Sequence, residues 1–224
     1  MPITRRRLPL LALLALAACG GGTSSSPSDA DLVLPGTFSE ETTVEDLKTR
    51  YGAANVVVGE LPDGEKGLIL FPNDPTLRAY VRFYDEEPMG HLAAITVVDR
   101  ESRWRGKGGV RIGMSLAEVV EKNANRFLFN GFDEKHEAQV RDYWDAGKLD
   151  VQEGDRLYFG VDLRLRAPVE QIPKGDYPSD GGQWSTDDPQ YPRLGEIAEV
   201  SAMSAWSSLD DEWSGLDRGR LAAR

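Results

Sequence analysis

The chain has 224 residues, of which 40% are hydrophobic, 28% charged and 8% aromatic, and its formal charge at pH 7 is −11. These proportions fit one globular domain or two small halves, and they exclude a collagen-like, disordered or multi-span membrane chain. A single cysteine excludes an internal disulfide and a cysteine-based zinc cage. The acidic excess argues against a nucleic-acid partner, because a negative surface repels phosphate.

The first 18 residues have the order of a secretory signal. Three arginines at 5–7 precede an apolar run at 8–16, and Ala17 and Ala18 precede Cys19. The apolar run is too short to span a bilayer. The segment Leu16-Ala17-Ala18-Cys19 resembles the lipobox of bacterial lipoproteins, which implies that Cys19 becomes an acylated N-terminus carrying chains such as palmitate. The alternative is an ordinary signal peptide with a chance cysteine at its cleavage site.

The lipobox resemblance implies a lipid bilayer as partner and the bacterial cell envelope as location. Gly20 follows the cysteine, which favours the outer membrane, with the domain facing the periplasm, over the inner membrane. Residues 4–8 resemble a twin-arginine signal, so both the general and the twin-arginine export routes stay open. Residues 19–30 then predict a lipidated cysteine and flexible tether, residues 31–216 a soluble domain, and residues 217–224 a frayed tail.

Residues 43–59 and 115–131 align without gaps at an offset of 72 positions. Each copy begins with a hydroxyl residue three positions before an acid, the capping box of a helix N-terminus: Thr43 with Asp46, and Ser115 with Glu118. Apolar residues at helical spacing follow in both copies, so each copy predicts one amphipathic helix. Chance similarity between two amphipathic helices is the alternative to duplication.

After each helix the apolar period changes to two, which predicts strands. In the first half they are expected at 55–59, 67–71, 77–84 and 92–99, and in the second at 126–131, 137–145 and 157–166, with a late strand at 195–206. The sequence thus predicts an α+β fold of two repeats, at about 38–100 and 109–206, each a helix followed by an antiparallel meander, with the helices on one face of the sheet or sheets.

The segment Gly113 to Val119 reads Gly-Met-Ser-Leu-x-Glu-Val, followed by an aromatic strand, and the whole unit is duplicated. This arrangement resembles the repeats of small bacterial outer-membrane lipoproteins and of the beta-lactamase inhibitor protein, over about residues 38–166. The resemblance implies a non-catalytic module that binds other proteins, and it suggests inhibition of a secreted hydrolase as an alternative function.

Motifs of catalysis and cofactor binding are missing from the sequence. No Gly-x-Ser-x-Gly elbow occurs, and His136 opens His-Glu-Ala-Gln-Val without the second histidine of a zinc protease. The acidic loop at 176–188 does not follow the EF-hand pattern, and the glycines at 106–109 lack the Walker spacing. We therefore expect no metal, no cofactor and no enzymatic activity. A glycan hydrolase that uses only two facing carboxylates is the rival of another class.

Strand alternation at 78–84 predicts a face that carries arginine and tyrosine together. Ala79, Val81 and Phe83 share the other face. Arginine and tyrosine dominate binding hot spots, although they also cover solvated sheet faces by cross-strand pairing. The candidate binding residues on this basis are Arg78, Tyr80, Arg82, Tyr84, Arg141 and Tyr143.

Residues 172–192 form an insertion with Tyr177, Trp184 and Tyr191 among several prolines and glycines. Exposed aromatic rings in such a loop are suited to stacking on a sugar or anchoring a protein, and the alternative is a loop whose rings fold back as a lid on the sheet. Trp206 and Trp213 are expected to close the core. We expect a membrane-anchored lipoprotein whose domain binds an envelope protein or glycan through the arginine and tyrosine face and this loop.

Overall fold

The computed structural model describes residues 27–86, 88–132, 137–140, 144–153, 155–173 and 175–207. The predicted anchor at Cys19, the candidate residues Arg141 and Tyr143, and the expected tail at 217–224 lie outside these ranges, as do His136 and Trp213. The described helices are α1 (Val44–Tyr51), α2 (Leu116–Asn123) and the short α3 (Leu194–Ile197). The described strands are β1 (Val56–Glu60), β2 (Lys66–Leu70), β3 (Ala79–Glu86), β4 (Met89–Val97), β5 (Leu128–Asn130), β6 (Glu137–Val140), β7 (Tyr158–Leu165), β8 (Gln183–Ser185) and β9 (Ala198–Trp206).

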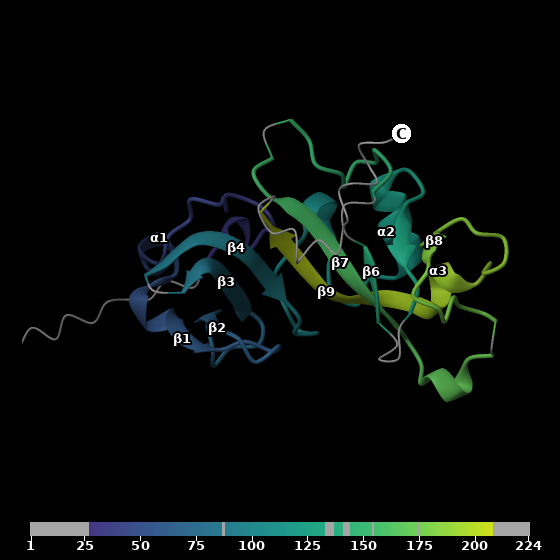
Figure 1. Cartoon of the computed structure of the whole chain (residues 1–224), viewed down its shortest axis with the longest axis horizontal. Coiled ribbons are helices and arrows are strands. Elements are labelled where there is room, and N and C mark those ends of the chain that lie inside the picture. Colours follow the sequence, from purple (N-terminus) through teal and green to yellow (C-terminus); the bar gives the residue numbers. More distant parts are fainter. Residues whose placement is uncertain are drawn as a thin grey trace, which may run out of the picture.

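Seven of these strands form one antiparallel sheet in the order β1-β2-β3-β4-β9-β7-β6. Figure 1 shows the strands of the first half on the left and β7, β6 and most of β9 on the right. The halves join where β4 pairs with β9, with Ala94 opposite Trp206 and Val97 opposite Met203. The predicted α+β class with a mostly antiparallel sheet is therefore confirmed.

Both long helices begin at the predicted capping boxes. The Thr43 hydroxyl accepts from the Asp46 amide at 3.2 Å, and the Asp46 carboxylate accepts from the Thr43 amide at 2.9 Å. Ser115 and Glu118 make the same reciprocal pair at the start of α2. These bonds satisfy amides that have no partner inside the helix, so the chain starts a helix at both places.

Two parts of the second half differ from the prediction. Strand β5 pairs with β8, which lies in the 172–192 insertion, and these two strands form a separate sheet instead of the start of a meander. The strand expected at 195–206 starts only at Ala198, because α3 occupies the residues before it. Strand β8 was not predicted, since Gln183–Ser185 is only three residues long and is defined as a strand by its pairing with β5.

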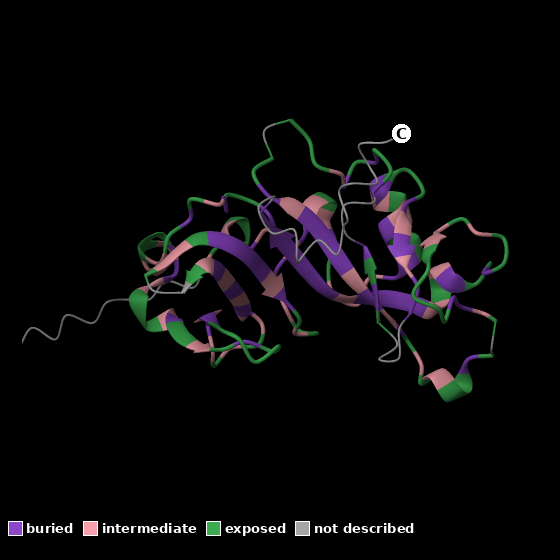
Figure 2. Ribbon diagram, viewed as in Figure 1, coloured by how far each residue is buried: buried purple, intermediate pink, exposed green. Residues whose placement is uncertain are grey.

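One continuous hydrophobic core unites the two halves of the sheet with the buried sides of α1 and α2. Figure 2 shows burial along β7 and β9, and exposure along β1 and the loops. Trp104 and Trp144 are fully buried, and their indole nitrogens donate to the carbonyls of Leu77 and Phe159, both at 2.7 Å. Trp206 is also fully buried, as predicted.

Candidate functional site

The predicted alternation of β3 is present. Ala79, Val81 and Phe83 are buried, whereas Arg78, Tyr80, Arg82 and Tyr84 lie partly exposed on the opposite face. Tyr80 stands between Ile69 of β2 and Thr96 of β4 in the sheet register. The alternation therefore places these four candidate residues on one face of β3 and of the residue before it, and we call this group the β3 strip.

Acidic residues hold both arginines of this strip. Arg78 donates from Nε and Nη2 to the two carboxylate oxygens of Asp99, at 2.9 and 2.7 Å. Arg82 pairs with Asp63 and, at 3.2 Å, with Glu65, both in the turn between β1 and β2. The strip is thus an arrangement of ion pairs with tyrosines between them, and it offers no unneutralised positive charge.

Two tyrosines of the sheet, Tyr84 and Tyr158, contact the end of β9. The Tyr84 hydroxyl lies 3.0 Å from the Ser207 hydroxyl, and the Tyr158 ring stacks on Trp206 with centroids 6.0 Å apart. Tyr158 opposes Trp206 in the register of β7 and β9. Aromatic side chains of three strands therefore converge near the seam between the halves.

Two of the three aromatic rings of the insertion at 172–192 fold inward, which agrees with the alternative of a folded-back loop and corrects the choice of Tyr177 and Tyr191 as exposed binding residues. Tyr177 and Tyr191 keep only 9% and 8% of their surface. Tyr177 packs edge-on against Phe132 and Tyr191 against Trp184, with centroids 5.9 and 5.2 Å apart. The cause is the pairing of β8 with β5, which draws the loop onto the domain. Trp184 alone stays partly exposed, and its indole donates to Asp180 at 2.8 Å.

A buried glutamate that the sequence did not indicate lies at the other end of β9. Glu199 is 5% exposed, and Arg164 donates to its Oε1 from Nε and Nη2 at 3.0 and 2.8 Å. Arg100 and Arg166 lie within ion-pair distance of the same carboxylate, at 3.5 and 3.4 Å. Three arginines from two segments thus meet on one acid: Arg100 follows β4, and Arg164 and Arg166 lie in β7 and directly after it. The cluster ties the connection between β4 and α2 to β7 and β9.

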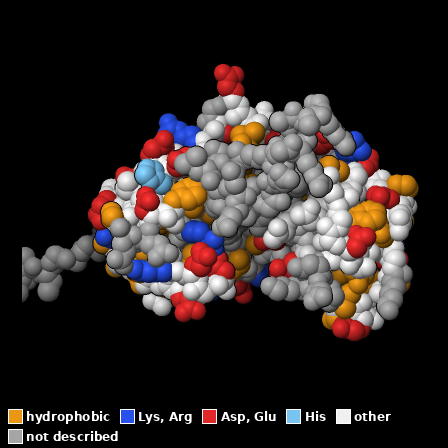
Figure 3. Space-filling model, in the orientation of Figure 1, with side chains coloured by type: hydrophobic (Ala, Val, Ile, Leu, Met, Phe, Trp, Pro, Cys, Tyr) orange, Lys and Arg blue, Asp and Glu red, His pale blue; other side chains and the backbone are white. Residues whose placement is uncertain are grey.

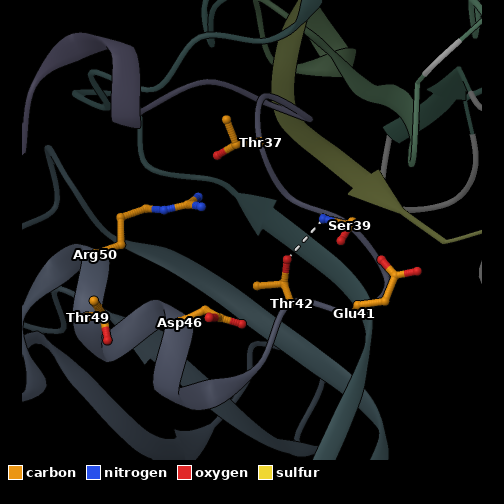
Figure 4. Close-up of a pocket in the computed structure, with 7 residues that line it drawn as sticks. All are labelled: Thr37, Ser39, Glu41, Thr42, Asp46, Thr49 and Arg50. Carbon is orange, nitrogen blue, oxygen red and sulfur yellow. Dashed lines mark hydrogen bonds between the residues drawn. The ribbon is translucent and has the colours of Figure 1, made fainter.

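An open pocket of about 510 Å³ lies between α1 and the segment that leads into it. Figure 4 shows the side chains that line it, which are Thr37, Ser39, Glu41, Thr42, Asp46, Thr49 and Arg50. Four of these seven side chains carry a hydroxyl group. The amide of Ser39 donates to the Thr42 hydroxyl at 3.0 Å, which fixes the bend of the segment. Of these residues the sequence pattern marks only Asp46, as part of the capping box, because the pocket forms only when the 37–42 segment folds over the helix.

Hydrogen bonds lower the pKa of both carboxylates of this pocket. The Ser39 hydroxyl, above all, holds the pKa of Glu41 below its ordinary value. The side chain and amide of Thr43 do the same for Asp46 within the capping box. The pocket therefore presents two negative charges at neutral pH.

Arg50 supplies the positive charge of the pocket. Its guanidinium carbon lies 5.0 Å from the centre of the Phe38 ring and 5.9 Å from that of Tyr51. Among the described residues, no carboxylate forms an ion pair with Arg50, in contrast to Arg78, Arg82 and Arg164. Figure 4 shows its side chain extending toward the space between Thr37 and Thr42.

A second pocket of about 430 Å³ lies beside the glycine-rich turn at 106–109. Lys107 in this turn binds the carboxylate of Asp155 and the carbonyl of Asp150. Burial alone would raise the pKa of Asp155, but the lysine and the Gln152 amide outweigh it and lower the pKa. The turn thus anchors the loop before β7, and its lysine has a structural role.

Charges of both signs are interspersed on the face in Figure 3, where the described residues carry no large patch of one sign. Within the ranges that the structure describes, no group of three or more His, Cys, Asp and Glu side chains is placed to hold a metal ion. No helix in those ranges has the length and apolar character needed to cross a membrane.

Comparison with known proteins found no family model, no curated protein and no solved structure that matches this chain.

Proposed function

We propose that this protein is a membrane-anchored envelope lipoprotein whose domain binds an envelope protein or glycan and catalyses no reaction. The observation that carries the anchor is the run from Arg5 to Cys19, with its basic, apolar and small-residue segments in signal order and its sole cysteine at the lipobox position. Several acyl chains on Cys19 would each contribute about 0.8 kcal/mol per buried methylene, so the anchor would be effectively permanent.

Metabolic labelling with a fatty-acid analogue tests the anchor. The wild type should be labelled and should fractionate with the outer membrane, whereas Cys19→Ala should lose the label. Label that persists in Cys19→Ala would remove the lipobox interpretation. Inner-membrane fractionation of the labelled wild type would correct the location only.

The charge states of the carboxylates support binding over hydrolysis. A glycosidase that uses two carboxylates needs one acid with a raised pKa to protonate the leaving group. Among the described Asp and Glu residues whose pKa departs clearly from its ordinary value, every shift is downward, Glu41 and Asp46 in the larger pocket included. Such groups are charged hydrogen-bond acceptors, and we propose that they serve structure and recognition.

The spacing of the elements supports a duplicated construction. Helices α1 and α2 have eight residues each and start 72 positions apart, at Val44 and Leu116. The residues that follow them, Gly52 and Ala124, both have positive φ, and β1 and β5 begin at the same offset, at Val56 and Leu128. We propose that the fold arose from two copies of one helix-and-meander unit, and that β5 left the main sheet when the 172–192 insertion supplied β8.

We propose that the partner contacts the β3 strip, at Tyr80, Arg82 and Tyr84, together with the partly exposed Trp184. Tyrosine and arginine in a rigid, ion-paired strip lose little side-chain freedom on binding, which favours their use as anchors. Crosslinked pull-downs from envelope extract should recover a partner with the wild type and lose it with the double variant Arg82→Ala/Tyr84→Ala. The matched control is Arg111→Ala, which removes an exposed arginine from the segment before α2. Equal recovery by all three proteins would exclude the strip.

A further inference from the structure

The pocket between α1 and the 37–42 segment has a distribution of charge that selects for a particular class of small molecule. It holds one cation, Arg50, and two anions, Glu41 and Asp46, with hydroxyl groups between them. Asp46 and Arg50 are four residues apart on α1, so they lie on the same face of the helix, one turn apart. Glu41 enters from the segment before the helix, so its charge comes from a separate element.

Arg50 is prepared to receive an anionic group. Its guanidinium lies over the rings of Phe38 and Tyr51, which limits its conformational freedom, and none of the described carboxylates pairs with it. The Tyr51 hydroxyl is a hydrogen-bond partner of this guanidinium, and a planar guanidinium with five N–H donors can also bind a carboxylate through two parallel hydrogen bonds. Burial raises the pKa of Tyr51 to about 12, so the neighbouring hydroxyl stays protonated and adds no competing negative charge at neutral pH.

The two carboxylates require a positive group in the same ligand. Hydrogen bonds hold Glu41 and Asp46 in the charged form, so a ligand that is only anionic would be attracted by Arg50 and repelled by both acids. A neutral polyol could donate to the carboxylates and accept from Arg50, but it carries no charge that either sign would attract. A molecule that carries a carboxylate and an ammonium group satisfies both signs at once.

Positive charges inside and outside the pocket act on its two acids. Arg156 and His91 both favour the charged form of Glu41, and Arg50 favours that of Asp46. Neither Arg156 nor His91 lines the pocket. The hydroxyls of Thr37 and Thr49 are exposed at the rim, where they can donate or accept as the ligand requires.

From this arrangement we infer that the pocket binds a small zwitterion of the α-amino-acid or short-peptide class, with its carboxylate on Arg50 and its ammonium group toward Glu41 and Asp46. The volume of about 510 Å³ lies within the range of small-molecule sites. Since the pocket is open and its lining side chains are polar or charged, a ligand would bury little apolar surface there. We therefore expect a dissociation constant of roughly 0.1 to 1 mM for such a zwitterion. The site uses residues outside the β3 strip, so it stands independently of the anchor and of the proposed protein partner.

Titration by nuclear magnetic resonance tests the inference with probes that differ in one charge. L-alanine and L-alanyl-L-alanine should shift amide signals of residues 37–50, and each should bind at least tenfold more tightly than N-acetyl-L-alanine, L-alaninamide or D-glucose. Comparing the first two probes shows whether a free amino acid or a peptide fits better, and either result supports the inference. Equal binding of the blocked analogues, preference for glucose, or no binding of either zwitterion up to about 10 mM would overturn it.

Single substitutions test the positive and the negative groups of the pocket separately. Arg50→Gln should weaken L-alanine binding at least tenfold, whereas Arg111→Gln, which changes an exposed arginine without an ion pair to any described residue, should leave it unchanged. Glu41→Gln changes an exposed side chain outside any helix or strand, so it preserves the fold and should weaken L-alanine without weakening N-acetyl-L-alanine. Unchanged L-alanine binding by folded Arg50→Gln or Glu41→Gln would contradict the assignment.

Discussion

At the scale of single residues, Glu199 is the buried carboxylate on which three arginines converge. The carboxylate is 5% exposed and accepts two hydrogen bonds from Arg164, with Arg100 and Arg166 beside it. Glu199→Gln removes the negative charge and leaves three arginines around a neutral amide. Because Arg164 is itself 39% exposed, water compensates part of the loss, and we expect the free energy of unfolding to fall by about 1 to 3 kcal/mol.

Urea denaturation followed by circular dichroism measures this change. Glu101→Gln is the matched control, because Glu101 is exposed and forms no ion pair with the described residues. Its stability should stay within about 0.5 kcal/mol of the wild type. A Glu199→Gln protein as stable as this control would show that the arginine cluster contributes nothing to the fold.

His91 should titrate at a higher pH than an isolated histidine. Its Nδ1 lies 2.7 Å from Asp85 Oδ2, and this hydrogen bond, together with the charges of Asp85, Glu40 and Glu41, raises the pKa of His91 above 6.5. A raised folded-state pKa means that the pair stabilises the fold below pH 6.5 and that this contribution is lost as the pH rises through the folded-state pKa. Two-dimensional spectra of the imidazole across pH 5 to 9 should show the upward shift in the wild type. Asp85→Asn should return the value toward 6.5, and an identical titration in both proteins would contradict the pairing.

The sequence could predict which residues share a face of β3 but not what those residues contact. Alternation places Arg82 and Tyr84 together because the period of a strand is local. The partners of Arg82 lie 17 and 19 positions earlier, at Glu65 and Asp63, and only the folded β1–β2 turn brings them near. Burial of Tyr177 and Tyr191 depends in the same way on the pairing of β5 with β8. Arg50 and its pocket depend on how the 37–42 segment bends.

At the scale of elements, the ends of the two helices differ in a way that predicts a stabilising change. Ala124 follows α2 in the left-handed conformation, with φ 57° and ψ 17°, where a Cβ atom is strained. The residue at the same place after α1 is Gly52. Ala124→Gly should remove the strain while increasing the freedom of the unfolded chain, for a net gain of about 0.5 to 1 kcal/mol.

The control for this prediction is the same substitution inside the helix. Ala117 is exposed in the first turn of α2, where glycine has lower helix propensity, so Ala117→Gly should lose up to about 1 kcal/mol. Thermal and urea unfolding of the two variants should therefore move in opposite directions. A loss of stability in Ala124→Gly would mean that the alanine side chain makes a compensating contact.

Local signals accounted for most elements, and long-range pairing accounted for the rest. Capping boxes located the starts of α1 and α2 because their hydrogen bonds span three residues. Alternation located the strands of the main sheet, apart from shifts of a few residues at their ends. The residue types of Gln183–Ser185 do not distinguish it from a loop. It is a strand because it pairs with Leu128–Asn130. The partner of a strand, and hence the sheet it joins, is a property of the folded chain.

At the scale of the whole molecule, the seam between β4 and β9 makes the two halves one cooperative unit. The pairs Ala94 with Trp206 and Val97 with Met203 cross it, and buried residues of both halves form one continuous core. Ile95 and Ala205, opposite one another at the seam, are both fully buried. Separation of the halves would expose this apolar surface to water, at about 25 cal/mol for each Å².

We therefore expect a single unfolding transition that two local probes report at the same denaturant concentration. Trp104 reports on the first half, because it lies 6.1 and 6.2 Å from the rings of Phe38 and Tyr51, and Trp144 on the second, because it lies 4.9 Å from Phe127. Fluorescence of Trp104→Phe and Trp144→Phe, each compared with the wild type, isolates the two signals. After correction for the stability of each variant, the two isolated signals should share one midpoint and one slope. If one signal changed well before the other, the halves would be separate folding units, and the seam would be a docking contact between two small domains instead of part of one core.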